Sequence, residues 1–364
     1  MSERIRYALL GCGRIAPNHI AAAINNGLDI CAVCDPVPER MEAVLVPVPQ
    51  EERARVRRYT NHRELLEKER PQLCAVATES GRHAAVGLDV LRAGSNAIIE
   101  KPLALSLHDA RALIAEAERQ GLKLCACHQN RFNKSIRQIR AAVEAGRFGP
   151  MLHGAAHIRW NRGPQYYEQA PWRGTWAQDG GALMNQCIHN IDLLRWMMGD
   201  QVDEVMAYTD NLTHDYIQAE DLGMALVKFS SGAYGLIEGT TNVYPRNLEE
   251  TLYLFGRDGT VKAGGKSVNA IETWEFRDGL DDAETVRKQC CENPPNIYGF
   301  GHTPLYADVI AAIRENRPPA VDGTAGMRAL ELVLAIYRSA AEHRPVRLPL
   351  EDCAATDFEG RFGR

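Results

Sequence analysis

The sequence predicts an α/β protein of two domains, an N-terminal domain built on a parallel sheet and a C-terminal α+β domain. Three observations lead to this prediction. The chain has 364 residues, which is enough for two domains of ordinary size. From residue 5 to residue 127 short apolar runs alternate with helical segments, as in a doubly wound parallel sheet. Beyond residue 128 strand-like runs follow one another with few helices between them, which predicts an antiparallel or mixed sheet.

The first domain is expected over residues 1–127. Its strands are predicted at residues 5–10, 30–34, 73–77, 97–100 and 122–127. Its helices are predicted at residues 15–26, 39–45, 63–69, 83–92 and 107–120. Ser106 and Asp109 have capping-box spacing at the start of the last helix. The proline-rich residues 45–50 are expected to form a loop.

The second domain is expected over residues 128–364 and opens with a helix at residues 134–145. Its strands are predicted at residues 152–160, 202–209, 222–229, 233–242, 250–255, 260–263 and 270–276. Further helices are predicted at residues 182–198, 304–315 and 324–341.

Composition excludes several classes of protein. The net charge is −5 and the arginines are scattered, so we expect no nucleic-acid partner. No apolar run approaches the ~18–20 residues of a membrane span, and the start MSERIR leads directly into a strand-like run, which argues against a signal peptide. The ten cysteines include Cys31 and Cys34 as a CxxC inside a predicted strand, and no second pair has zinc-ligand spacing. We therefore expect reduced thiols, a cytoplasmic protein and no metal site.

A glycine-rich turn follows the first predicted strand. The segment GCGRIA places Gly11, Gly13 and Ala16 at G-x-G-x-x-A spacing between a strand and a helix, the context of a Rossmann dinucleotide site. Arg14 and Ile15 lie within this turn and are expected beside the cofactor. Asp35 ends the next strand, where a carboxylate binds the adenosine ribose hydroxyls and repels a 2′-phosphate. The sequence thus predicts NAD rather than NADP.

A lysine follows the strand predicted at residues 97–100. Lys101 in IIEKPLALS falls at the carboxyl end of a parallel strand, where ligands bind in this architecture. A solvated surface charge is the alternative interpretation. Pro102 fixes the backbone directly after the lysine, and a cis peptide there is one way to aim the ammonium into a cleft.

Four segments, GCGRIA, EKPLA, HQNRF and GGALMNQCIHNIDLL, resemble the glucose–fructose oxidoreductase / inositol dehydrogenase (Gfo/Idh/MocA) family over essentially the whole chain. The resemblance implies a Rossmann domain followed by a domain with a large open-faced, mostly antiparallel sheet, and NAD as cofactor. It also implies a homo-oligomer, expected to be a tetramer, because such a sheet buries itself against another subunit. Positions matching the cofactor-lining residues of the family are Thr78, His83, Glu100, Lys101, Gln129, Trp172, Arg173 and Tyr306.

Longer blocks narrow the resemblance. WNRGPQYYEQAPWRGTWAQDGGALMNQCIHNIDLL, YPRNLEETLYLFGRDGTVKAGG and YGFGHTPLYADVI are similar to the UDP-N-acetylglucosaminuronate 3-dehydrogenases of surface-polysaccharide pathways. This implies oxidation of a C3 hydroxyl of a UDP-sugar by NAD, on the way to a diacetamido uronic acid.

The helix predicted at residues 182–198 carries the candidate base. Asn185, His189, Asp192 and Trp196 lie on one stripe, whereas the core stripe consists of Met184, Cys187, Ile188, Ile191, Leu194 and Met198. A histidine satisfied within the core is the alternative for His189. With the resemblance, His189 is expected to take the proton of the reacting hydroxyl while Lys101 polarises it. Many relatives have an aspartate where this chain has Asn185, so Asn185 is expected to orient substrate.

Substrate recognition is expected to use guanidinium groups for phosphate and carboxylate and an aromatic wall. The candidates are Arg131, Arg159, Arg162, Arg173 and Tyr167, with a solvated surface charge as the alternative for each arginine. Two other functions are compatible with the fold: a dehydrogenase of a free polyol or aldose, and a non-catalytic NAD-binding regulator, against which the joint presence of Lys101 and His189 argues. A zinc hydrolase using Cys187, His189 and Asp192 is excluded because Cys187 and His189 point to different helix faces.

Overall fold

The computed structural model describes residues 4–199, 201–294 and 297–362. The chain forms two compact units, the first made of Met1–His128 and His302–Met327 and the second of Gln129–Gly301 and Arg328–Arg364. The first division falls one residue after the boundary expected from the sequence, and residues 302–327, expected in the second domain, group with the first unit. Residues 302–327 return to the first unit, where Val321 accepts a backbone hydrogen bond from Ala126 at 3.1 Å. Such a return depends on long-range pairing, which local patterns do not reveal.

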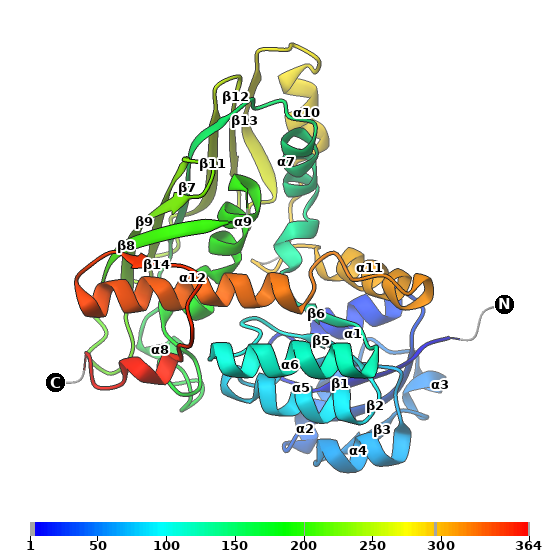
Figure 1. Cartoon of the computed structure of the whole chain (residues 1–364). Helices are drawn as coiled ribbons and strands as arrows, with labels where there is room; N and C mark the ends of the chain where they lie inside the picture. Colours follow the sequence, from blue (N-terminus) through cyan, green and yellow to red (C-terminus); the bar gives the residue numbers. More distant parts are fainter. Residues whose placement is uncertain (1–3, 200, 295–296, 363–364) are drawn as a thin grey trace. The chain divides into compact units, whose positions relative to one another are not determined.

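The first unit is built on the predicted parallel sheet, whose strands are coloured blue to cyan in Figure 1. Its strand order is β3-β2-β1-β4-β5-β6. The strands are β1 (Arg6–Leu10), β2 (Asp29–Cys34), β3 (Arg57–Tyr59), β4 (Leu73–Val76), β5 (Asn96–Ile99) and β6 (Leu124–Ala126). The helices are α1 (Ala16–Asn25), α2 (Pro38–Val44), α3 (Gln50–Arg53), α4 (His62–Glu69), α5 (His83–Arg92), α6 (Leu107–Gln120) and α11 (His302–Glu315). Sequence patterns missed β3 and α3 because both are short and largely exposed.

The second unit contains an eight-stranded sheet of order β13-β12-β11-β7-β10-β9-β8-β14. Only the β7–β10 pair is parallel among its described pairs, so the predicted mixed, mostly antiparallel sheet is confirmed. The strands are β7 (Met151–Arg159), β8 (Val202–Asp210), β9 (Leu222–Phe229), β10 (Tyr234–Thr240), β11 (Glu249–Gly256), β12 (Gly259–Gly264), β13 (Ala270–Phe276) and β14 (Val346–Arg347).

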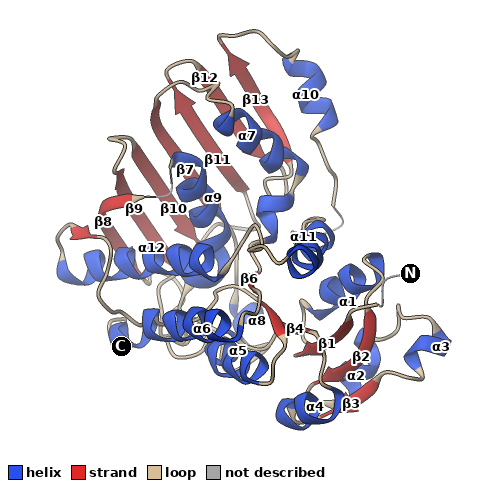
Figure 2. Cartoon of the chain, turned by 45° about the vertical axis from the view of Figure 1, so that its right-hand side comes forward, coloured by secondary structure: helices blue, strands red, loops and turns tan. Residues whose placement is uncertain are grey.

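Helices cover one face of this second sheet (Figure 2). The helices are α7 (Lys134–Glu144), α8 (Pro164–Tyr167), α9 (Ile188–Met198), α10 (Ala283–Gln289) and α12 (Gly323–Glu342), of which α12 begins in the first unit. Short 3-10 turns lie at Ser80–Arg82, Gln129–Phe132 and Ala355–Phe358. No helix in the described part of the chain has the length and apolar character needed to cross a membrane.

The helix that carries the candidate base departs from the prediction in one respect. Its first turn, Leu183–Cys187, is a π-helix, and α9 follows it without a break. A π-helical turn widens the helix locally and is often found at functional sites. The predicted core stripe is confirmed, since its six members, from Met184 to Met198, are at most 1 % exposed.

Two glycines of the sheet make room for this π-helical turn. Gly223 on β9 and Gly239 on β10 are paired directly across the strands. A Cβ at Gly223 would lie 2.5 Å from Leu183 Cδ1, and one at Gly239 would lie 2.6 Å from Leu183 Cδ2. The sheet is therefore indented where Leu183 sits, and the indentation fixes the height of the turn above the strands.

Glu220 also contacts the π-helical turn Leu183–Cys187, through the backbone of its first residue. Its Oε1 accepts the backbone N–H of Leu183 at 2.8 Å and lies 2.8 Å from the hydroxyl of Tyr337. That hydroxyl has one proton and also lies 2.5 Å from the carbonyl of Gly180, which can only accept. Both contacts of Tyr337 are hydrogen bonds only if Glu220 carries a proton. Burial of Glu220, 0 % exposed, raises its pKa to about 8, in agreement with a neutral acid.

We predict that Gly223→Ala destabilises the protein by about 1–3 kcal/mol, because the added methyl overlaps Leu183 in a packed core. Urea unfolding measures the change. Gly163→Ala is the control, since a Cβ at Gly163 meets no atom within 4 Å and its φ of −95° suits any residue. Equal losses in the two variants would contradict the role of the indentation.

We also predict that stability falls as pH rises from 6 to 9 and falls less in Glu220→Gln. Between the ordinary glutamate pKa and about 8, folded Glu220 keeps a proton that the unfolded chain has lost, so raising the pH favours unfolding. The variant should retain about 2 kcal/mol more of its pH 6 stability at pH 9. Glu67→Gln, at an exposed position, should behave like wild type. Identical pH slopes for all three proteins would show that Glu220 is already ionised.

Candidate active site

The glycine turn of the first unit has the geometry that a dinucleotide requires. Gly11 has φ +98°, and a Cβ there would lie 2.4 Å from the carbonyl oxygen of Ala77. A Cβ at Gly13 would meet open space, so a phosphate can approach the backbone here. Ala16 is fully buried and begins α1, whose N-terminus favours an anion. Arg14 and Ile15 connect the glycines to this helix, as expected.

Asp35 lies at the carboxyl end of β2 beside this turn. Its Oδ2 accepts the N–H of Cys12 at 2.8 Å and its Oδ1 accepts the N–H of Val37 at 2.9 Å. Each carboxylate oxygen accepts more than one hydrogen bond, which leaves capacity for ribose hydroxyls. The residues of the first unit therefore fit NAD, for which Gly11, Gly13 and Asp35 are the predicted contacts.

Lys101 follows β5 and is half-buried, and its bond to Pro102 is cis. Glu100, 6 % exposed, accepts the Lys101 backbone N–H on Oε2 at 3.2 Å. His19 Nε2 lies 3.0 Å from Glu100 Oε1, and His302 Nε2 lies 3.6 Å from it. Burial alone raises the pKa of Glu100, but the contacts with His19 and His302 outweigh it and hold this pKa well below its usual range. Glu100 is thus a buried carboxylate that fixes the Lys101 turn.

His83 and Tyr306, expected beside the cofactor, lie beneath this turn. His83 is 1 % exposed, with Nδ1 2.7 Å from the Pro102 carbonyl and Nε2 3.1 Å from the Thr78 carbonyl. Burial lowers its pKa, so the ring is neutral and its single N–H favours the shorter contact. Tyr306 is fully buried, and its hydroxyl lies 2.7 Å from His19 Nδ1. We infer that both residues support the Lys101 turn instead of contacting NAD, whereas Thr78 itself is half-buried.

The cluster beneath Lys101 brings together groups that can ligate metals. The ligand atoms of His19, Glu100, Cys127 and His302 lie within 4.8 Å of one another. The contact between His19 and Glu100 explains this arrangement without an ion. Burial raises the pKa of Cys127 well above its usual value, which favours its thiol form.

In the second unit, Asn185 and His189 are half-buried on the π-helical turn and on α9. The Asn185 amide donates to Asp179 Oδ1. Asp179 is 2 % exposed, and its Oδ2 accepts the N–H of Gly174 at 2.8 Å. A buried carboxylate therefore orients Asn185. Sequence reasoning missed it, and its only signal was its position directly before GGALMN.

Two arginines expected to bind substrate are instead paired with carboxylates of the chain. Arg131 donates to Asp192 through Nε at 2.7 Å and Nη2 at 2.6 Å, at 5 % exposure. Arg159 pairs with Glu238 and Glu249 on the uncovered face of the sheet. A guanidinium engaged in this way does not present its donors to a ligand, so the structure does not support a substrate role for either. We assign Arg131 to holding α9, where it also stacks 4.5 Å over Trp196.

A chain of hydrogen bonds links the other candidate arginines. Arg162 Nη2 donates to Gln186 Oε1 at 2.9 Å, and Gln186 Nε2 donates to the Tyr166 hydroxyl at 2.8 Å. Arg173 donates to the same hydroxyl and lies 4.6 Å over the ring of Trp172. Sequence reasoning missed Gln186, because a regular helix gives no reason to single it out from the buried stripe.

Two candidates remain, Tyr167 and Gln129. The Tyr167 hydroxyl lies 3.4 Å from Thr241 Oγ1, and the side chain is half-buried. Gln129 is 3 % exposed and its amide donates to Asn130 at 3.5 Å.

Comparison with known proteins gives one family match in each of the two units of the chain. Residues 5–128 match the oxidoreductase family with an NAD-binding Rossmann fold, and residues 136–262 match the GFO/IDH/MocA C-terminal domain. The structure is similar to the WlbA dehydrogenase of Bordetella pertussis in complex with NADH and UDP-GlcNAcA, with 35% identity and a TM-score of 0.88 over 96% of this chain and 99% of that one.

Of two further relatives, one is also named with UDP-GlcNAcA and the other is named for a free sugar. The WlbA dehydrogenase of Chromobacterium violaceum, also solved with NADH and UDP-GlcNAcA, is 35% identical with a TM-score of 0.86, over 96% of this chain and 98% of that chain. D-apiose dehydrogenase of Paraburkholderia graminis is 26% identical over 362 residues, which cover 95% of this chain and 90% of the relative. The Rossmann turn, the Lys101 segment and matches over both units together place this chain in the GFO/IDH/MocA family as an NAD-dependent oxidoreductase.

Proposed function

We propose that this protein oxidises the C3 hydroxyl of UDP-N-acetylglucosaminuronic acid to a ketone, on the way to a diacetamido uronic acid for surface polysaccharide. The observation that carries the proposal is the 35% identity, over nearly the full length, to two dehydrogenases solved with NADH and UDP-GlcNAcA. All ten cysteines are free thiols, which is consistent with the cytoplasmic compartment that we propose.

The chemistry assigns separate tasks to two residues. NAD, when bound, supplies the hydride acceptor. Lys101, held by Glu100 through its backbone N–H, is proposed to stabilise negative charge on the substrate oxygen. His189 is proposed to accept the hydroxyl proton on a ring nitrogen.

Asn185 is proposed to position the substrate. Its donation to Asp179 fixes the plane of the amide, which suits a directed hydrogen bond to a substrate group. Trp172, Arg173 and Tyr167 are proposed to bind the nucleotide and the acidic groups, with Arg173 as the cation.

A free aldose is the second candidate substrate, favoured by the match to D-apiose dehydrogenase. A free aldose is smaller, so it would leave the hydrogen-bonded side chains of Arg162, Gln186 and Arg173 without a role in binding. For this reason we favour the nucleotide sugar.

We predict that UDP-N-acetylglucosaminuronic acid, but not D-apiose or myo-inositol, reduces NAD with this enzyme, followed as NADH absorbance. His189→Asn and Lys101→Met should each lower kcat by about 10²–10⁴-fold. His189→Asn should leave NAD affinity, measured by calorimetry, nearly unchanged. Lys123→Met, at an exposed bond to Asn316, is the control. Turnover of the free sugars alone would refute the substrate, and loss of NAD binding in His189→Asn would refute its role as base.

We also propose that the uncovered face of the second sheet joins copies of this chain. Tyr208 is paired with Met224, and Leu226 with Leu236, across adjacent strands. All four are exposed, between 40 % and 67 %, so the apolar side chains form a continuous patch, which is unusual on a monomer.

Light scattering should then give a mass of several chains, with a tetramer expected. Leu226→Glu should lower that mass because it places a charge in the middle of the buried patch. Leu280→Glu, at an exposed residue in the turn after β13, should leave it unchanged. A monomeric wild type, or an unaltered mass in Leu226→Glu, would rule out this interface.

A further inference from the structure

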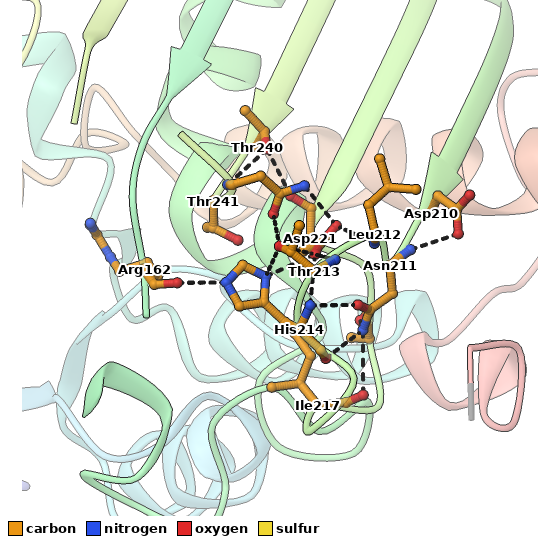
Figure 3. Close-up of polar contacts among 12 residues, drawn as sticks. Arg162, Asp210, Asn211, Leu212, Thr213, His214, Ile217, Asp221, Thr240 and Thr241 are labelled. Atoms are coloured by element: carbon orange, nitrogen blue, oxygen red, sulfur yellow. Dashed lines mark hydrogen bonds and ion pairs between the residues drawn. The ribbon is translucent and has the colours of Figure 1, made fainter. Parts of the chain in front are cut away.

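The segment between β8 and β9 is organised around one buried carboxylate (Figure 3). Asp221 is fully buried. Its two oxygens accept the backbone N–H groups of Leu212 at 3.0 Å and Thr213 at 2.8 Å. They also accept side-chain bonds from Thr213 at 3.0 Å and Asn242 at 3.0 Å. The loop of residues 211–220 is therefore folded back onto the start of β9.

His214 connects this carboxylate to another part of the chain. Its Nδ1 lies 2.8 Å from Asp221 Oδ2, and its Nε2 lies 2.6 Å from the carbonyl oxygen of Arg162 (Figure 3). Burial raises the pKa of Asp221, but the bonds from His214 and the loop amides outweigh it and hold this pKa below its usual range. Asp221 is thus ionised. Since both partners are acceptors, the two contacts of His214 are hydrogen bonds together only when both ring nitrogens carry hydrogen.

Arg162, whose carbonyl oxygen contacts His214, belongs to the candidate substrate region. The Arg162 backbone N–H donates to the Thr241 carbonyl at 2.9 Å, which ties it to the end of β10. Its guanidinium donates to Gln186 on the π-helical turn. One residue therefore connects His214 to the turn that carries Asn185.

The same loop supports the segment that follows Arg162. Gln218 and Ala219 donate backbone bonds to the Gly174 carbonyl at 2.9 and 3.1 Å. The ring of Tyr167 lies 5.5 Å from that of His214 and 5.8 Å from that of Tyr216. Residues 162–176 are the part of the second unit that contains Tyr167, Trp172 and Arg173, and the loop contacts them at both ends.

We propose that His214, bridging Asp221 and the Arg162 carbonyl, is a positioning residue that holds residues 162–176 ready for the nucleotide part of the substrate. The proposal rests on the function proposed above. His214 is not a catalytic residue, because it is 5 % exposed and both ring nitrogens face protein acceptors. Its effect should therefore fall on substrate binding and leave the chemical step unchanged.

His214→Gln tests this positioning role, because an amide nitrogen can donate to only one of the two acceptors and the amide oxygen faces the other. We expect KM for UDP-N-acetylglucosaminuronic acid to rise about tenfold, as for the loss of about 1.4 kcal/mol of binding, with kcat within about twofold. Amide hydrogen exchange should become faster in peptides covering residues 163–176 and stay unchanged in the first unit.

Thr213→Val is the matched control. It removes the hydroxyl that contacts the same carboxylate, Asn242 and His214 Nδ1, but leaves both contacts of the His214 bridge to Asp221 and Arg162. KM and the exchange of residues 163–176 should therefore match wild type. The proposal is overturned if His214→Gln resembles Thr213→Val in both measurements, or if it lowers kcat with KM unchanged.

Two further readouts separate the possible failures. If wild type does not oxidise the UDP-sugar, the proposed function fails, while the exchange comparison still decides the role of His214. If His214→Gln does not fold, ¹⁵N NMR of histidine-labelled wild type at neutral pH gives the answer. Hydrogen on both ring nitrogens of His214 supports the bridge, and hydrogen on only one overturns it.

Discussion

A carboxylate taken out of water must be compensated by donors, and in this protein that requirement fixes the segments that carry the candidate site. Asp35 accepts the N–H of Cys12 in the glycine turn and the N–H of Val37. Glu100 has two histidine contacts and accepts the N–H of Lys101. Asp192 takes the guanidinium of Arg131, and Asp179 takes the amide of Asn185. In each case the donor has few alternative positions, because moving it leaves a buried charge uncompensated.

The number of donors decides which buried acids are ionised. Asp221 accepts bonds from three backbone amides and three side chains, and its pKa is lowered. Glu250 is 4 % exposed and, among the described residues, accepts a side-chain bond only from Asn130 at 3.3 Å, so burial raises its pKa to about 8. Glu220 behaves in the same way. Asp221, with many donors, is thus charged and holds a polar loop, whereas the poorly compensated Glu220 and Glu250 are neutral.

Local patterns predicted the parts of the structure that depend on local chemistry. The parallel sheet, the turn at Gly11 and Gly13, and the buried stripe of α9 all follow from alternation, glycine placement and helical spacing. The return of residues 302–327 to the first unit was not predictable in this way, because Tyr306 finds Tyr7 and His19 only in the folded chain. The pairing of Arg131 was not predictable either. In a sequence, an arginine that binds a ligand cannot be distinguished from one that pairs with a buried aspartate.

The π-helical turn shows how such a local departure arises. Leu183 enters an indentation that exists because two glycines face each other on neighbouring strands, and Glu220 takes the Leu183 N–H. The helix widens to accommodate both contacts of Leu183. The widening sets the position from which the Asn185 side chain projects. Asp179 then fixes the Asn185 amide, so a buried negative charge acts one helical turn before His189. Asn185 thereby carries the orienting effect of a carboxylate that lies six residues earlier in the chain.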